Sequence, residues 1–168
     1  MAALTGFRPT VVYGGAPDGV LPTRYYVPVA ANVTIYGGAL VVIDSSGNAN
    51  PGGIAQGSCL GLADAGSAGG GVSSVSGTAV AGTNFIQVRN GCFLWDFSAA
   101  NGGAYTKANF GQKVYVVDDH TVQLTNGGSN TTTAGLSMGL NPSPTSLDPT
   151  QIQVAVLTIG VGAFGVIT

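Results

Sequence analysis

His120 is the single histidine of the chain, and it directly follows Asp118 and Asp119. Imidazole and carboxylate groups bind divalent metals and serve in acid–base catalysis, so this trio is the first place to look for chemistry. Neighbouring side chains of an extended chain point in different directions, however, and one turn does not supply converging ligands without help from elsewhere. We therefore interpret the trio as a solvated turn and predict no metal and no cofactor.

Other catalytic arrangements lack partners in the sequence. There are seven Asp and no Glu, and only Asp118 and Asp119 are adjacent, so a glycosidase-like carboxylate pair has few candidates. A Ser or Thr nucleophile needs a base, which only His120, Lys107 or Lys113 could provide. No glycine run has the Lys and Ser/Thr of a phosphate-binding loop. We expect no enzyme activity and no catalytic residue.

The composition favours β-structure and disfavours helix. Glycine contributes 28 of the 168 residues, Val, Thr, Ser and Asn are abundant, and charged residues make up only 7%. Glu, Lys and Arg are good helix formers, whereas Val and Thr favour strands. The sequence predicts an all-β protein with many turns and a size close to one ordinary domain.

The sparse charge also bears on partners. Nucleic-acid binding depends on clustered cations, but the basic residues are scattered singly: Arg8, Arg24, Arg89, Lys107 and Lys113. The most apolar segment, from Ile152 to Ile167, is interrupted by glycines and is too short to span a bilayer. We expect neither nucleic acid nor membrane as a partner. So few charges favour a surface that is largely covered by other protein chains.

The cysteines Cys59 and Cys92 are interpreted as two small buried apolar residues, although a bridge between them stays an alternative. Asn84–Val88 and Cys92–Phe97 are predicted to form a hairpin through Arg89-Asn90-Gly91, because Asn-Gly suits a tight turn. The aromatic side chains at positions 93, 95 and 97 share one face of this strand by their spacing. We interpret them as core anchors, with a sugar-stacking platform as the alternative.

The elements that position these residues are organised around a predicted hairpin from Phe110 to Leu124. Its alternating apolar residues flank the polar reversal at 118–121. The same unit appears twice at a constant offset. The matching pairs are Gly37 and Gly111, Val42 and Val116, Asp44 and Asp118, Gly61 and Gly135, and Leu62 and Leu136. Two similar β-units closing around a shared core are predicted.

The domain organisation follows from the glycine and proline content. Residues 1–28 hold four prolines and are predicted to be an extended N-terminal arm, since proline is disfavoured in central strands. Residues 29–168 form a single β domain with a Gly/Ser-rich insertion at about 65–82. A rigid proline-rich loop is expected at 141–149.

The second unit resembles a known family. Gly111-Gln-Lys-Val-Tyr-Val116, the Thr121-Val return, Ala134-Gly-Leu136 and the closing strand Gln153-Val-Ala-Val156 are similar to the head decoration, or capsid cement, proteins of tailed bacteriophages. Gly91-Cys-Phe-Leu-Trp95 resembles the strand that precedes this hairpin in that family. The similarity covers about residues 33–160. Departures are the insertion at 65–82, the N-terminal arm and the 141–149 loop.

The resemblance implies a compact β-barrel or β-tulip-like domain, made in the bacterial cytoplasm, that binds the outer surface of the phage head and bridges major capsid subunits. The implied partners are the major capsid protein and the chain itself, as a dimer or trimer. An extended segment can add a strand to an exposed sheet edge, so we expect neighbour contacts in the arm, and secondarily in the proline-rich loop. The candidate contact residues are Thr10, Val11, Val12, Tyr13, Arg24, Tyr25, Tyr26, Asn141, Pro142, Pro144 and Pro149.

Two alternatives stay open at this point. A phage head fibre or glycan-binding host-recognition module would use exposed aromatic side chains, with Trp95 as its test. A secreted bacterial surface or pilus-like subunit would also be rich in Gly, Thr and Asn and poor in charge. A precursor with a signal peptide, or a bridge between Cys59 and Cys92, would favour that second alternative.

Overall fold

The computed structural model describes residues 24–53, 57–64, 74–126, 132–142 and 147–156. Within these ranges the regular elements are strands, apart from one turn of 3-10 helix, which confirms the predicted all-β fold. No helix among the described residues has the length and apolar character required to cross a membrane. The strands divide between two units, which we call unit 1 (residues 24–89) and unit 2 (residues 91–156).

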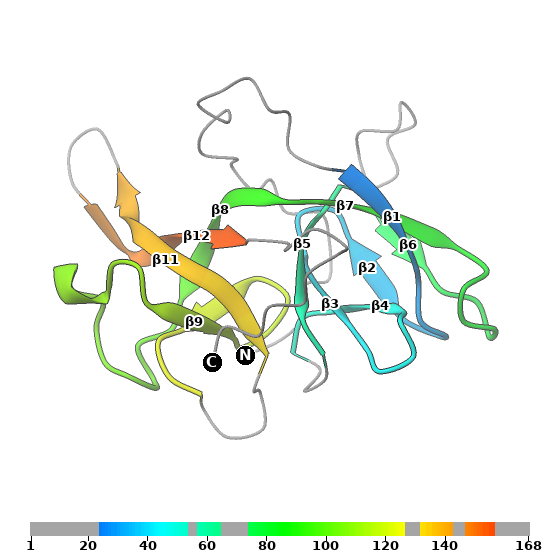
Figure 1. Ribbon diagram of the computed structural model, residues 1–168, viewed down its shortest axis with the longest axis horizontal. Helices are drawn as coiled ribbons and strands as arrows, with labels where there is room; N and C mark the ends of the chain where they lie inside the picture. The colour runs from blue at the N-terminus through cyan, green and yellow to red at the C-terminus, as the bar shows by residue number, and fades with distance from the viewer. Residues whose placement is uncertain (1–23, 54–56, 65–73, 127–131, 143–146, 157–168) are drawn as a thin grey trace.

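Unit 1 holds seven strands: β1 (Arg24–Pro28), β2 (Thr34–Tyr36), β3 (Leu40–Ile43), β4 (Ala49–Pro51), β5 (Cys59–Ala63), β6 (Ser74–Ser76) and β7 (Phe85–Arg89). Unit 2 holds β8 (Gly91–Phe97), the 3-10 turn η1 (Lys107–Asn109), β9 (Lys113–Val116), β10 (Thr121–Gln123), β11 (Thr133–Pro142) and β12 (Leu147–Val156). Figure 1 shows β1, β4 and β7 in one half of the molecule and β9, β11 and β12 in the other.

The two units have the same strand order. Unit 1 forms a sheet in the order β1-β7-β5-β3-β4, and unit 2 forms a closed barrel in which β8, β12, β11, β9 and β10 follow one another in the same way. The barrel of unit 2 is closed by parallel pairing of β10 with β8. In unit 1 an isolated parallel bridge between Val29 and Ala49 joins the end of β1 to the start of β4, the strands that correspond to β8 and β10. The predicted duplication is therefore present in the topology.

A glycine bulge recurs in both units. Gly61 in β5 and Gly135 in β11 have φ angles of +136° and +155°, and both lie at a register irregularity against the preceding hairpin strand. A Cβ on either glycine would lie 2.3 Å from a backbone carbonyl oxygen, of Arg89 and of Ala155 respectively. Only glycine permits such a close approach of two strands. These two residues are equivalent, as the sequence comparison predicts.

The equivalence of β3 and β9 is shifted by one residue from the prediction. Gly38 donates its N–H to the Ala63 carbonyl at 2.9 Å, and Gly111 donates to the Ser137 carbonyl at 2.8 Å, so Gly111 matches Gly38 and not Gly37. Matching identical residues paired Gly111 with Gly37, one residue away from its structural equivalent, because Gly37 and Gly38 are both glycines. Gly38 and Gly111 also share a positive φ, of +85° and +76°.

Unit 1 and unit 2 share a core. One buried cluster consists of residues of unit 1, including Val41 and Ile86. The second cluster lies inside unit 2 around Phe93 and Trp95, yet it also contains Leu40, Val42 and Leu62 of unit 1. Alternate residues of β3 thus face the two clusters. Strand β3 is buried on both faces, which explains its uninterrupted apolar sequence.

Two predicted connections differ from the structure. β7 and β8 do not form a hairpin: β7 pairs with β1 and β5, whereas β8 pairs with β12 and β10. Asn90 therefore joins the two units, because each strand finds its partners within its own unit. The 141–149 loop is also shorter than predicted. Asn141 pairs with Asp148 and Pro142 with Leu147, since strands β11 and β12 extend into it.

Candidate interaction surfaces

The predicted contact residues fall into three groups. Thr10, Val11, Val12, Tyr13 and Pro144 lie outside the described residues. Arg24, Tyr25 and Tyr26 lie on β1, the first strand of unit 1. Asn141, Pro142 and Pro149 lie in the ends of β11 and β12, where the Asn141 side chain donates to Gln151 Oε1 at 3.1 Å.

The three β1 residues have different surroundings. Arg24 lies 3.5 Å from Asp64 Oδ2, which also accepts a 2.6 Å ion pair from Arg89. The Tyr25 hydroxyl donates to the Leu60 carbonyl at 2.5 Å, which fixes this ring within the fold. Tyr26 is 64% exposed. Tyr26 is therefore available for contact with another molecule, as is the Arg24 side chain, which is 46% exposed.

Tyr26 is part of an exposed face on β1 and β7. The register pairs Tyr26 with Gln87 and Pro28 with Phe85, which places all four side chains on one side of the two strands. Gln87 Nε2 donates to the Tyr26 hydroxyl at 3.1 Å, and Phe85 is 55% exposed. We call these four residues the β1–β7 face. Two large exposed aromatic side chains together are unusual for a surface that meets only water.

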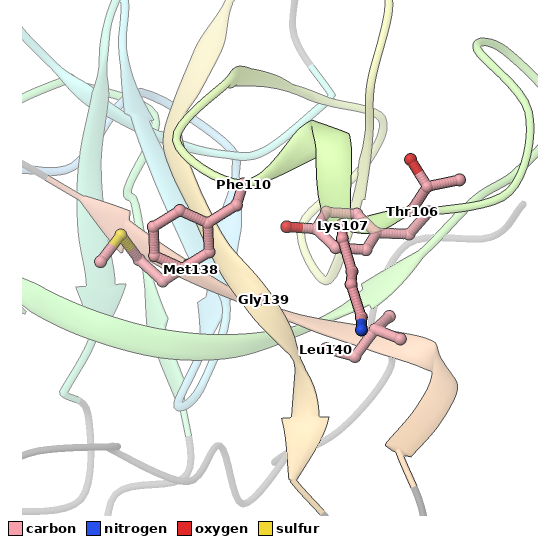
Figure 2. Close-up of a pocket in the computed structure, with 7 residues that line it drawn as sticks. Thr106, Lys107, Phe110, Met138, Gly139 and Leu140 are labelled. Carbon is pink, nitrogen blue, oxygen red and sulfur yellow. The ribbon is translucent and has the colours of Figure 1, made fainter.

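A pocket of about 620 Å³ lies on unit 2 beside η1. Figure 2 shows its walls, with Phe110 and Met138 to one side of β11 and Lys107 and Leu140 to the other. Phe110 is 60% exposed and Met138 is 39% exposed. We call this site the η1 pocket. It combines apolar walls with one cation, a combination suited to an apolar group that carries or adjoins a negative charge.

The floor of the η1 pocket is held by packed and hydrogen-bonded groups. The Tyr105 ring packs edge-on against Phe97 at a centroid distance of 6.0 Å, and its hydroxyl donates to Ser137 Oγ at 3.3 Å. Ser137 in turn donates to the Asn109 carbonyl in η1. The sequence analysis missed this pocket, because its walls come from segments about thirty residues apart. The sequence holds one weak signal for the pocket, a methionine followed by a glycine at positions 138 and 139.

The corresponding place in unit 1 is covered by the chain itself. The Ala39 N–H donates to the Tyr36 carbonyl just as the Gln112 N–H donates to the Asn109 carbonyl, so β2 stands where η1 stands in unit 2. In unit 1, β2 pairs with β6, a strand from the 65–82 insertion, and Val75 packs onto the core. Among the described residues of unit 2, no strand pairs with η1 in the way that β6 pairs with β2, and this side of η1 is open as a pocket.

The Asp118–His120 turn is not solvated, contrary to the prediction. Asp118 and Asp119 are 7% and 2% exposed, because the turn is inserted against unit 1. Leu40 donates its N–H to the Asp119 carbonyl at 2.7 Å, and a Cβ on Gly52 would lie 2.7 Å from the Asp118 carbonyl. The turn therefore joins the units. Sequence reasoning treated it as an isolated hairpin and did not include the contact with unit 1.

The remaining candidate groups are placed as follows. Phe93 and Trp95 are fully buried, which confirms that they are core anchors and leaves Trp95 unable to stack on a sugar. Phe97 is only partly buried and packs against the edge of the same cluster. Cys59 and Cys92 are free thiols, each half-buried. Burial raises the pKa of the Cys59 thiol to about 12 and raises that of Cys92 as well, so neither is an activated nucleophile.

Comparison with protein-family models, with curated proteins and with solved structures found no match to this chain. The resemblance to head decoration proteins therefore stays a prediction from the sequence motifs.

Proposed function

We propose that this chain is a structural protein of a bacteriophage virion, which binds the outer surface of the head and bridges major capsid subunits. The observation that carries the proposal is that a charge-poor molecule presents two different apolar surfaces, one on each unit. Tyr26 and Phe85 belong to unit 1, whereas Phe110 and Met138 belong to unit 2. A molecule with one contact surface binds a neighbour, and one with two separate surfaces joins two neighbours.

The two surfaces differ in ways that suit a bridging role. The β1–β7 face is an open pair of strands that offers aromatic rings, and the η1 pocket is concave and carries Lys107. Contacts of modest strength at each surface add through multivalency, because the second contact forms within an already bound complex. A shell subunit then leaves only if several contacts break together. The partners proposed are the major capsid protein and further copies of this chain; the proposal includes no catalytic step.

The first test is the copy number of this chain relative to the major capsid protein in purified virions, measured by quantitative mass spectrometry. A ratio near one to one is expected for a protein that covers the lattice. A handful of copies per particle would instead indicate a fibre or tail component, and absence from virions would contradict the proposal.

The second test separates the two surfaces. Shells prepared without this chain are mixed with wild-type protein, Tyr26→Asp, Phe110→Asp or the double variant, and bound copies are counted after sedimentation. Each single variant is expected to bind several-fold more weakly, and the double variant to lose binding. Ser45→Asp, which adds the same charge at an exposed turn of unit 1, is the matched control. Equal binding by all variants would exclude both surfaces.

Deletion of residues 1–20 tests the arm in the same assay. The first described strand, β1, begins at Arg24, so a deletion that ends at residue 20 leaves every described strand in place. It is expected to preserve thermal unfolding while it weakens attachment. Unchanged attachment would remove the arm from the proposal and leave the two apolar surfaces as its basis.

A further inference from the structure

The Asp118–His120 turn brings three metal-ligating side chains together at the junction of the two units. His120 Nδ1 lies 3.2 Å from Asp118 Oδ1 and 3.0 Å from Asp119 Oδ1. One ligand atom from each of the three residues lies within 4.8 Å of the other two. The turn thus supplies the converging set that an isolated hairpin was not expected to give.

A buried oxygen of this cluster lacks a partner. Asp118 Oδ2 is shielded from solvent and accepts no hydrogen bond from the described residues, although Asp118 Oδ1 accepts one from the His120 N–H at 3.1 Å. A buried carboxylate oxygen without a donor costs free energy, and such groups are normally paired or bound to a metal. The Asp118 side chain is 10% exposed, and its other oxygen, Oδ1, is the atom that lies close to the imidazole.

The matching hairpin of unit 1 shows how such a carboxylate is satisfied without a cation. Asp44 Oδ1 accepts the N–H groups of Ser46 and Asn48, each at 2.9 Å, and Asp44 Oδ2 accepts from Asn50 Nδ2 at 3.1 Å. In unit 2 the strand after the turn provides Gln123 in place of Asn50, and the Gln123 side chain accepts from Asn101. With β3 and β9 aligned through Gly38 and Gly111, Asp44 corresponds to Val117. Asp118, Asp119 and His120 then stand where unit 1 has Ser45, Ser46 and Gly47, so the turn of unit 1 offers no comparable set of ligands.

We propose that Asp118, Asp119 and His120 bind one divalent metal ion of the Zn²⁺ class. One imidazole nitrogen with carboxylate oxygens is a donor set that Zn²⁺ accepts, whereas Ca²⁺ takes six to eight oxygens. Bonds of about 2.0–2.1 Å in a tetrahedral site place neighbouring ligands roughly 3.3 Å apart, close to the separations in the turn. A metal bound to the Asp118 carboxylate would also neutralise its charge, which offsets the cost of burying Oδ2 without a donor.

The site is preorganised and accessible. The backbone of the turn is fixed from outside by Leu40, which donates to the Asp119 carbonyl, and by Asp96, which donates its N–H to the His120 carbonyl at 3.1 Å. The glycine at position 52 packs directly on the turn. The His120 side chain is 19% exposed, so an ion has a route from solvent. Bound metal would stabilise the contact between unit 1 and unit 2, since the turn belongs to unit 2 and packs against unit 1.

The single histidine makes the test direct. The full chain is treated with EDTA and titrated with Zn²⁺ while the imidazole nitrogens are followed by NMR. Saturation at one Zn²⁺ per chain, with the largest change at Nδ1 of His120 and a rise in the thermal unfolding temperature, is expected. Titration with Ca²⁺ is expected to leave both signals unchanged. An imidazole signal that does not respond to Zn²⁺ would overturn the proposal.

Two variants keep the test specific. Asp118→Asn retains an oxygen that can accept the His120 N–H, so the turn is preserved, yet it removes the charge; at least a tenfold loss of Zn²⁺ affinity is expected. The matched control Asp44→Asn changes the hairpin of unit 1 and is expected to bind Zn²⁺ as the wild type does. If Asp118→Asn fails to fold, His120→Gln takes its place, with binding measured by calorimetry. Equal affinity in the wild type and the folded variant would show that Zn²⁺ binds elsewhere, for example at the free thiols.

Discussion

Strands β3 and β9 occupy the same place in the two units and have different environments. Leu40 and Val42 of β3 point away from the centre of unit 1 and are buried in the core of unit 2. The matching residues of β9, Lys113 and Tyr115, are only half-buried. The same backbone position is thus internal in one unit and external in the other. The difference shows that the two copies are packed asymmetrically, with β3 between the two cores and β9 at the surface.

The loss of Trp95 should produce the largest effect. Trp95 pairs with Ile152 in unit 2, and Val27 pairs with Ile86 at the same place in unit 1. Trp95 and Val27 are therefore equivalent positions occupied by side chains of very different size. Trp95→Ala is expected to destabilise the protein by about 3–5 kcal/mol and Val27→Ala by about 1–2 kcal/mol, in proportion to the buried volume removed. Urea unfolding measures both. Equal losses would mean that the two interiors do not differ as described.

The paired bulge glycines should behave alike, in contrast to the strands around them. Gly61→Ala and Gly135→Ala each place a Cβ 2.3 Å from a carbonyl oxygen at a positive φ, and a loss of about 2–4 kcal/mol is expected for each. Gly103→Ala is the control, because its φ is +77° but no atom lies within 4 Å; about 1 kcal/mol is expected. Thermal unfolding of the three variants decides whether the bulge is a shared requirement.

The junction can be disturbed without a substitution in either buried cluster. Gly52→Ala directs a Cβ at the Asp118 carbonyl, 2.7 Å away, and should cost about 1–3 kcal/mol. Because Leu40, Val42 and Leu62 of unit 1 remain in the core of unit 2, the two units are expected to unfold together at a lower denaturant concentration. Trp95 fluorescence reports on unit 2 and far-UV circular dichroism on both. Unchanged stability would show that the turn contributes little to the joint.

The smallest effect is expected at the exposed turn of unit 1. Burial tends to raise the pKa of Asp44, but hydrogen bonds from Asn48, Asn50 and Ser46 outweigh it and lower the pKa below its ordinary value. Asp44→Ala should cost about 1 kcal/mol at neutral pH, as does loss of a comparable side-chain cap. A lowered pKa stabilises the fold above the unfolded-state value and ceases to do so as pH falls through the folded-state value. The difference between wild type and variant should therefore shrink below about pH 4.

The sequence was sufficient for the local structure and insufficient for the joint. The hairpin at 113–123 and the equivalence of Gly61 and Gly135 could be predicted, because alternation and glycine geometry are local properties. The burial of Asp118 could not be predicted, since it results from contact with Gly52, far away in the chain. For the same reason the η1 pocket was missed. Tyr26 is exposed, and its contact with a neighbouring molecule stays a prediction. The predicted hairpin of β7 and β8 was wrong, because the Asn90-Gly91 sequence suits a tight turn but here connects two strands that pair with other partners.

The residues that β3 and β5 contribute to the core of unit 2 have a consequence for how this protein is made and inherited. Unit 1 emerges from the ribosome first, with Leu40, Val42 and Leu62 directed toward a neighbour that has not yet been synthesised. Its outer side is complete only when unit 2 has folded against it. A gene cut between the two copies would therefore yield a first half with an exposed apolar face, and selection would act against separating them. The two repeats are therefore expected to be inherited together as a single domain.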